Sequence, residues 1–216
     1  MRTLTYLAEH GEEVLRLTVR HGALVVVATG LAVLTAVPLG LWIARRPRFA
    51  APVLGAAGAL MTVPSIALLG LLIPLLSGIG QGIGAVPTVI ALFAYSQLPI
   101  VQNTHAAVVG IDPAVLDAAR GMGMGRADLL WRVQFPIALP VILGGIRTAV
   151  VMNIGVAAVA AYIGAGGLGH LVQVGLNALD DAVVLAGALL LSTLALAAEL
   201  LLGWAQRALT PPTLRR

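Results

Sequence analysis

Residues 112–136 read Asp112-Pro-Ala-Val-Leu-Asp-Ala-Ala-Arg-Gly-Met-Gly-Met-Gly-Arg-Ala-Asp-Leu-Leu-Trp-Arg-Val-Gln-Phe-Pro136, a polar stretch inside an otherwise apolar chain. No Asp, Glu, Lys or Arg occurs in the preceding run from Phe49 to Ile111. A compact charged segment between long apolar runs is typical of a loop that joins two membrane spans. The contrast predicts a membrane protein with one elaborate polar loop, and residues 112–136 are called the polar loop.

The composition of the whole chain agrees with this prediction. Of the 216 residues, 59% are hydrophobic and 10% are charged, and the mean hydropathy is +0.99. A soluble domain carries about 25% charged residues, so we expect an all-α membrane bundle folded as one domain. The net charge of +4 comes from Arg residues scattered over several loops, which argues against a nucleic-acid partner. The chain has no Cys and therefore no thiolate metal site.

We expect about five membrane-spanning helices, since each needs about 20 apolar residues. The long uncharged run before the polar loop suits two of them, because Gly and Pro residues between 77 and 87 interrupt it. The predicted spans lie near 22–44, 52–76, 86–106, 143–165 and 183–204, in a membrane domain 21–206 between an N-terminal extracytoplasmic segment 1–20 and a cytoplasmic tail 207–216.

The arginines predict an orientation. They follow the first span at 45–48, recur in the polar loop and follow the last span at 207–216. With five spans these segments share one side of the membrane, which the positive-inside rule assigns to the cytoplasm. The opposite loops, 77–86 and 166–181, contain no Arg. We therefore expect the N-terminus outside and the C-terminus in the cytoplasm; a cleaved signal peptide within 1–44 fits less well, because its apolar run is too long.

The polar loop itself predicts two short helices joined by glycines. Asp112 and Pro113 suit a helix start, and the glycines at 121, 123 and 125 permit a tight turn. A second helix over 126–135 would end or kink at Pro136. The residues alone leave two roles open for this loop. It could lie on the membrane as an amphipathic anchor with Trp131 at the interface, or it could form a docking surface.

The polar loop resembles the Glu-Ala-Ala loop of ABC importer membrane subunits. That pattern is Glu-Ala-Ala, three residues, Gly, nine residues, Ile, any residue, Leu-Pro, and this chain has Asp117-Ala-Ala, Gly123 and Val133-Gln-Phe-Pro136 at the same spacing. The departures, Asp for Glu, Val for Ile and Phe for Leu, are conservative. The resemblance implies the type I importer membrane fold, with the loop as a coupling helix in a cleft of a cytoplasmic ATPase subunit. The implied contact residues are Asp117, Ala118, Ala119, Arg120, Met122 and Gly123.

Four further stretches, 62–67, 98–104, 144–149 and 163–169, resemble osmoprotectant permeases, and the similarity covers roughly residues 20–205. It implies a translocation path for a solute of the glycine betaine, choline and carnitine class. The implied partners are an external solute-binding protein, a second permease, identical or paralogous, and two ATPase subunits, in the inner membrane of a prokaryote. No cofactor is implied. The alternatives are a permease for amino acids or another small polar solute, or an ion-coupled secondary transporter.

Several enzymatic interpretations fit the sequence poorly. The chain contains no Lys and no P-loop, so we expect it to have no ATPase site of its own. Gly164-Ala-Gly-Gly-Leu-Gly169 satisfies the dinucleotide fingerprint, but a membrane span precedes it where the fingerprint needs a strand, so a tight turn is the better interpretation. With nine aromatic residues the chain shows no cage for a quaternary ammonium ion. We therefore expect the binding protein to select the solute.

A few polar residues fall inside the predicted spans. Arg147 and Glu199 lie at equal depth, so they could pair across two helices, or each could extend separately to the membrane surface. Asn153 and Tyr162 fall in the fourth span, where bonding between helices is favoured over lining of a solute path. No His and carboxylate cluster predicts a metal site.

Overall fold

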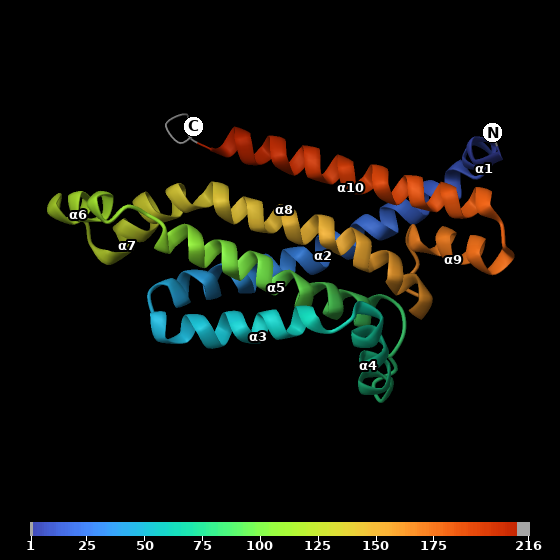
Figure 1. Ribbon diagram of the computed structural model, residues 1–216, viewed down its shortest axis with the longest axis horizontal. Helices are drawn as coiled ribbons and strands as arrows, with labels where there is room; N and C mark the ends of the chain where they lie inside the picture. The colour runs from blue at the N-terminus through green and yellow to red at the C-terminus, as the bar shows by residue number, and fades with distance from the viewer. Residues whose placement is uncertain (1, 211–216) are drawn as a thin grey trace.

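The computed structural model describes residues 2–210, which form helices and short connections (Figure 1). The long helices are α2 (Gly11–Ala44), α5 (Ala85–Val109), α8 (Phe135–Val159) and α10 (Asp181–Leu209). The shorter ones are α1 (Arg2–Glu9), α3 (Ala50–Thr62), α4 (Ser65–Ser77), α6 (Pro113–Gly121), α7 (Arg126–Asp128) and α9 (Gly169–Ala178). Turns of 3-10 helix cover Pro47–Phe49 and Ala160–Ile163, and a π-helical segment covers Leu129–Gln134. Residues 2–210 contain no strand, which confirms the predicted all-α class.

Small residues bring the central helices close together. Helix α5 packs against both α2 and α8, and α10 packs against α8 and α9 (Figure 1). Ala28, Ala32 and Ala36 of α2 are completely buried. A Cβ atom at Gly145 of α8 would lie 2.6 Å from the Pro99 carbonyl oxygen of α5. Such close approach is the main source of helix attraction in lipid, where burial from water is not available.

The replacement Gly145→Val tests this packing. The new side chain would meet the backbone of α5, which cannot move aside, so we expect a loss of about 1–3 kcal/mol of stability. Gly155→Val is the matched control, because it adds the same side chain to the same helix and nothing lies within 4 Å of that position. The measurement is the unfolding midpoint of each variant in detergent. Equal midpoints would show that the α5–α8 contact does not depend on a missing Cβ.

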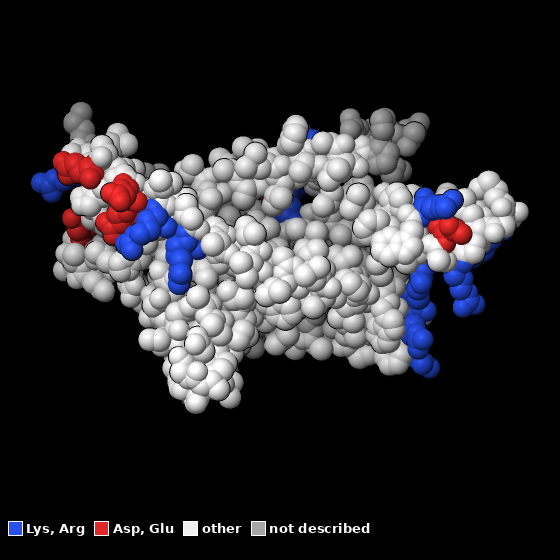
Figure 2. Space-filling view, turned by 180° about the vertical axis from the view of Figure 1, so that it is seen from behind, with Lys and Arg blue, Asp and Glu red and all other residues white. Residues whose placement is uncertain are grey.

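The charged side chains gather at the two ends of the bundle, with a largely uncharged band between them (Figure 2). The end that carries Arg45, Arg46, Arg48 and the polar loop is called the arginine end. The opposite end, formed by α1, α9 and the first turns of α2 and α10, mixes acids with arginines and is called the mixed end. Helix α2 alone is about 51 Å long at 1.5 Å per residue, more than the hydrocarbon thickness of about 30 Å. Both ends can therefore reach beyond the apolar band.

Within residues 2–210, four helices are long and apolar enough to cross a membrane, and α3 with α4 would make a fifth span if the two count as one. The single helix predicted over 52–76 is wrong, because α3 and α4 meet at 94°. Pro64 disfavours the helical conformation of the residue before it, and Val63 is extended at φ −70° and ψ 124°. The Val63 carbonyl has left the helical ladder, and it accepts a hydrogen bond from the Tyr95 hydroxyl of α5.

Three other boundaries differ from the prediction. Helix α2 begins at Gly11, so residues 11–20 continue the helix of the first span. The fourth span begins at Phe135 and not near 143, because the π-helical segment leads directly into α8. Pro136 therefore does not end a helix; it lies inside a continuous helical run, directly after the π-helical segment. The loop predicted over 166–181 contains α9, which sequence reasoning missed.

Candidate functional site

The polar loop projects from the arginine end, with α6 at its tip (Figure 1). Asp112 starts α6 as predicted: its Oδ1 accepts a hydrogen bond of 2.8 Å from the Ala114 N–H, and Pro113 takes the first helical position. Within α6, Arg120 Nη1 lies 2.7 Å from Asp117 Oδ1, and their side chains are 59% and 71% exposed. The pair lies on the outside of the loop, where a partner could contact either residue.

The structure separates the two alanines of the Glu-Ala-Ala pattern. Ala118 is exposed, whereas Ala119 is only 3% exposed and faces the rest of the loop. The Ala119 carbonyl accepts a hydrogen bond from the Met124 N–H, which fastens the turn to α6. Met122 at the end of α6 is 72% exposed. The face available to another protein therefore carries Asp117, Ala118 and Met122, while Ala119 holds α6 in place.

Of the three glycines in the predicted turn, only Gly123 has a backbone conformation that favours glycine. Gly123 has φ +82°, in the left-handed region that costs other residues about 1–2 kcal/mol. Its N–H donates to the Arg120 carbonyl at 2.9 Å. Gly125 precedes α7 in an extended conformation and, as predicted, offers no side-chain cap. The turn at Gly123 thus sets the direction of α6 relative to α7.

The second half of the polar loop is continuous with a membrane helix. Residues 126–163 form one uninterrupted helical run that includes α7, the π-helical segment and α8. Leu129 is buried at the base of the loop, and Arg132 pairs with Asp128 at 3.1 Å. Since no break separates this half of the loop from α8, a displacement of α7 would be carried into the membrane.

A buried polar contact joins three helices in the middle of the bundle. Asn153 of α8 is completely buried, and its Nδ2 donates to Thr29 Oγ1 of α2 at 3.0 Å and to Ser96 Oγ of α5 at 2.8 Å. Its Oδ1 is buried with no hydrogen-bond partner among the described residues. In this arrangement Asn153 bonds between helices. Tyr162 is not brought to it, since Tyr162 lies on the 3-10 turn after α8 and is 52% exposed.

Arg147 and Glu199 meet across α8 and α10, with Arg147 Nη2 3.2 Å from Glu199 Oε1. Arg147 Nη1 also donates to Gln206 Oε1 at 3.2 Å, and Gln206 Nε2 donates to the Pro140 carbonyl at 2.7 Å. Of the two alternatives for these charges, the structure contains the ion pair. Sequence reasoning missed Gln206, because an uncharged residue near a span end gives no signal of its partner.

The double-mutant cycle of this ion pair has a definite expected outcome. Glu199→Gln leaves Arg147 without its carboxylate, and we expect lower assembly and thermal stability, with partial recovery when Arg147→Gln is added. Polar pairs between membrane helices contribute about 0.6 kcal/mol on average and up to about 1.7 kcal/mol. Because both side chains are more than one-third exposed, we expect a coupling near the lower value. Melting temperatures in detergent measure the cycle, and losses that simply add would contradict the pairing.

Sequence reasoning also missed His21, which lies one residue before the predicted first span. The His21 side chain is completely buried, and its Nε2 is 3.1 Å from the Ile154 carbonyl oxygen, so that nitrogen is the donor. The ring packs against Gly167, where a Cβ atom would lie 2.9 Å from Nδ1. His21 therefore fixes the glycine turn after α8 against α2, which supports the structural interpretation of the Gly164–Gly169 motif.

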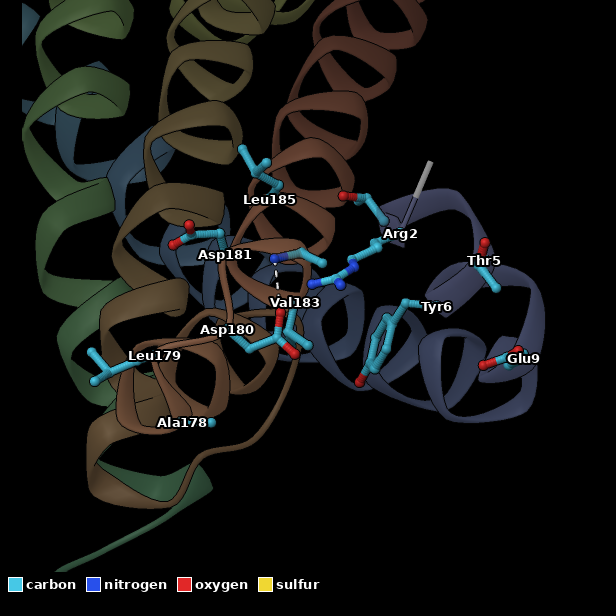
Figure 3. Close-up of a pocket in the computed structure, with 12 residues that line it drawn as sticks. Arg2, Thr5, Tyr6, Glu9, Ala178, Leu179, Asp180, Asp181, Val183 and Leu185 are labelled. Carbon is cyan, nitrogen blue, oxygen red and sulfur yellow. Dashed lines mark hydrogen bonds between the residues drawn. The ribbon is translucent and has the colours of Figure 1, made fainter.

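A pocket of about 960 Å³ opens at the mixed end between α1 and the start of α10. Arg2 and Tyr6 of α1 face this start, and Asp180 Oδ1 accepts a hydrogen bond of 2.9 Å from the Ala182 N–H (Figure 3). Burial, and then the carboxylates of Glu13 and Asp180, raise the pKa of the Tyr6 phenol, which keeps it protonated. No group of three or more His, Asp or Glu within residues 2–210 is placed to hold a metal ion.

Comparison of the sequence with known proteins places the chain in one protein family. Residues 36–211 match the sequence family described as binding-protein-dependent transport system inner membrane component. The chain is 51% identical over 215 residues to the osmoprotectant import permease protein OsmW of Salmonella typhimurium, with 100% of both chains covered. It is 38% identical to the glycine betaine/carnitine/choline transport system permease protein OpuCD of Bacillus subtilis, covering 96% of this chain and 89% of that protein.

Among solved structures, the fold is similar to an inward-facing form of the MetNI methionine ABC transporter. The TM-score is 0.81 at 21% identity, with 92% of this chain and 96% of that chain covered. At this identity the likeness concerns the fold alone.

Proposed function

The chain belongs to the family of binding-protein-dependent transport system inner membrane components, and from this premise we propose that its polar loop transmits the work of an ATPase to the membrane helices. As a member it is a multi-pass inner-membrane permease subunit of an ABC importer. The observation that carries the proposal is the exposed α6, which connects through the turn at Gly123 to an unbroken helical run from Arg126 into α8.

The proposal includes an orientation, with the arginine end in the cytoplasm. Arg45, Arg46 and Arg48 lie at that end, and the positive-inside rule places such clusters on the cytoplasmic side. The mixed end, with α1 and the pocket beside α10, then faces the external binding protein. The C-terminal tail beyond residue 210, predicted to be cytoplasmic, lies outside the described residues.

The complete importer would contain two ATPase subunits, one on each of two permease subunits, identical or paralogous. Closure of the ATPase pair would move α6 and, with it, α8. The ion pair of Arg147 with Glu199 fastens α8 to α10, and Asn153 fastens α8 to α2 and α5. A displacement of α8 would therefore be shared by the bundle, which opens and closes the solute path between the permeases. The chain supplies no Lys and no P-loop for hydrolysis of its own.

The proposed solute is a small zwitterion or quaternary ammonium compound of the osmoprotectant class. The names of OsmW and OpuCD, which cover nearly the whole chain, support this class. Amino acids or other small polar solutes are the second candidate. Ion-coupled transport is disfavoured, because the one carboxylate within the predicted spans, Glu199, is held by Arg147.

Reconstitution into vesicles tests the function. The permease, its ATPase subunits and its binding protein are assembled together, and uptake of labelled glycine betaine, choline, carnitine and methionine is followed. We expect uptake of one or more of the first three only when ATP is supplied on the ATPase side. Uptake driven by an ion gradient without ATP would reject the importer mechanism, and preferential uptake of methionine would reject the solute class.

A further inference from the structure

An apolar groove of about 520 Å³ lies at the arginine end, between the last turns of α2 and the base of the polar loop. Leu34, Pro38 and Trp42 border it on α2, and Trp131 and Phe135 border it on the other side. The rings of Trp131 and Phe135 are in contact, with centroids 5.4 Å apart. Arg45, at the end of α2, is the one charged residue among those that line the groove.

The wall residues are open to the surroundings. Leu34 is 72% exposed, Trp131 60% and Trp42 41%. Trp is the side chain most typical of the membrane interface, where one edge is apolar and the other is wet. A groove with an apolar floor, two Trp residues and a cation at one end matches an amphiphile whose chain is apolar and whose head is an anion.

No carboxylate within residues 2–210 pairs with Arg45 or with the two arginines that follow it. Of the acids at this end, Asp117 pairs with Arg120 and Asp128 pairs with Arg132, while Asp112 caps α6. Arg45, Arg46 and Arg48 form no ion pair within residues 2–210; Arg46 lies over the Trp42 ring and Arg48 over the Phe49 ring. The mouth of the groove therefore carries a net positive charge with no carboxylate of residues 2–210 to balance it.

We propose that this groove binds an anionic phospholipid of the surrounding membrane, with an acyl chain along the apolar walls and the phosphate at Arg45. The inference rests on the proposed orientation, which places the arginine end in the leaflet where anionic lipids attract basic segments. The occupant would touch α2 on one side and Leu130, Trp131 and Phe135 on the other. It would thus stabilise the position of the π-helical segment that joins α7 to α8, and so the coupling movement itself would depend on lipid charge.

The test uses the permease assembled with its partner subunits in lipid nanodiscs. Trp204 is replaced by Phe, so that Trp42 and Trp131 are the fluorescent residues of this chain, and a variant with all three replaced gives the background of the partners. Phosphatidylglycerol or phosphatidylcholine with brominated acyl chains is then added as a quencher. We expect phosphatidylglycerol to quench at lower concentration, and Arg45→Gln to reduce that preference about fivefold, which corresponds to about 1 kcal/mol for one interfacial cation.

Arg48→Gln is the matched control, because it removes the same charge from the same end but does not line the groove. Equal quenching by the two lipids, or an equal effect of the two substitutions, would reject a specific site. Absence of quenching by either lipid would show that a protein subunit covers the groove. The quenching needs no ATP, so it can fail while ATP-driven uptake by the same assembly succeeds, and the lipid site and the proposed function are tested separately.

Discussion

Gly123→Val is expected to remove most ATP-driven import while the permease still inserts and folds. Gly123 has φ +82°, and a side chain in this conformation costs about 1–2 kcal/mol. A change of that size shifts the balance between the native turn and other arrangements by about 5- to 30-fold. Nothing lies within 4 Å of a Cβ at this position. The substitution should therefore change the turn, and with it the direction of α6, and leave the packing of the bundle unchanged. Solute uptake per inserted permease measures the loss.

Gly125→Val provides the control for this prediction. It lies in the same loop, also has free space around a Cβ, and has an extended backbone at φ −71° and ψ 169° that a branched residue adopts easily. We expect import close to that of the unchanged protein. ATP hydrolysis that continues in Gly123→Val without import would identify uncoupling. Full import by Gly123→Val, or the same loss in both variants, would show that the direction of α6 is not what the turn provides.

The parts of the polar loop that the sequence predicted correctly depend on neighbours along the chain. The Asp112 side chain caps an N–H two residues away, and the Gly123 N–H bonds to a carbonyl three residues before it. Both partners of each contact lie within one short window, so residue type and spacing were enough. The helix end predicted at Pro136 is wrong, because the π-helical segment before this proline leads directly into α8 and has no sequence pattern of its own.

The break at Val63–Pro64 could not be predicted from proline alone. Pro38, Pro99 and Pro140 lie inside α2, α5 and α8, which continue through them. At Val63 the freed carbonyl finds the Tyr95 hydroxyl on another helix, and this contact joins residues far apart in the sequence. The contacts of His21 with Ile154 and of Gly145 with Pro99 were missed for the same reason.

Ala118→Trp is expected to lower the affinity of the permease for the ATPase subunits by about 5- to 150-fold. This range corresponds to a penalty of about 1–3 kcal/mol for overpacking a close contact. Ala118 is exposed on α6, beside the Asp117–Arg120 pair, whereas Ala119 is buried in the loop. A large ring at 118 would keep a partner surface from approaching α6 without disturbing the contacts inside the chain. Retention of the ATPase subunits during purification, and their affinity for the reconstituted permease, measure the effect.

Ala127→Trp is the matched control, since Ala127 is also exposed in the polar loop but lies on α7. This comparison separates the two roles that the sequence left open. If the loop were only a membrane anchor, a Trp at either position would enter the interface, and both variants would be tolerated or would bind the membrane more strongly. If α6 docks on an ATPase, only Ala118→Trp loses the partner. Because both variants keep the same charge and the same added ring, a difference between them must come from the surface that each one faces.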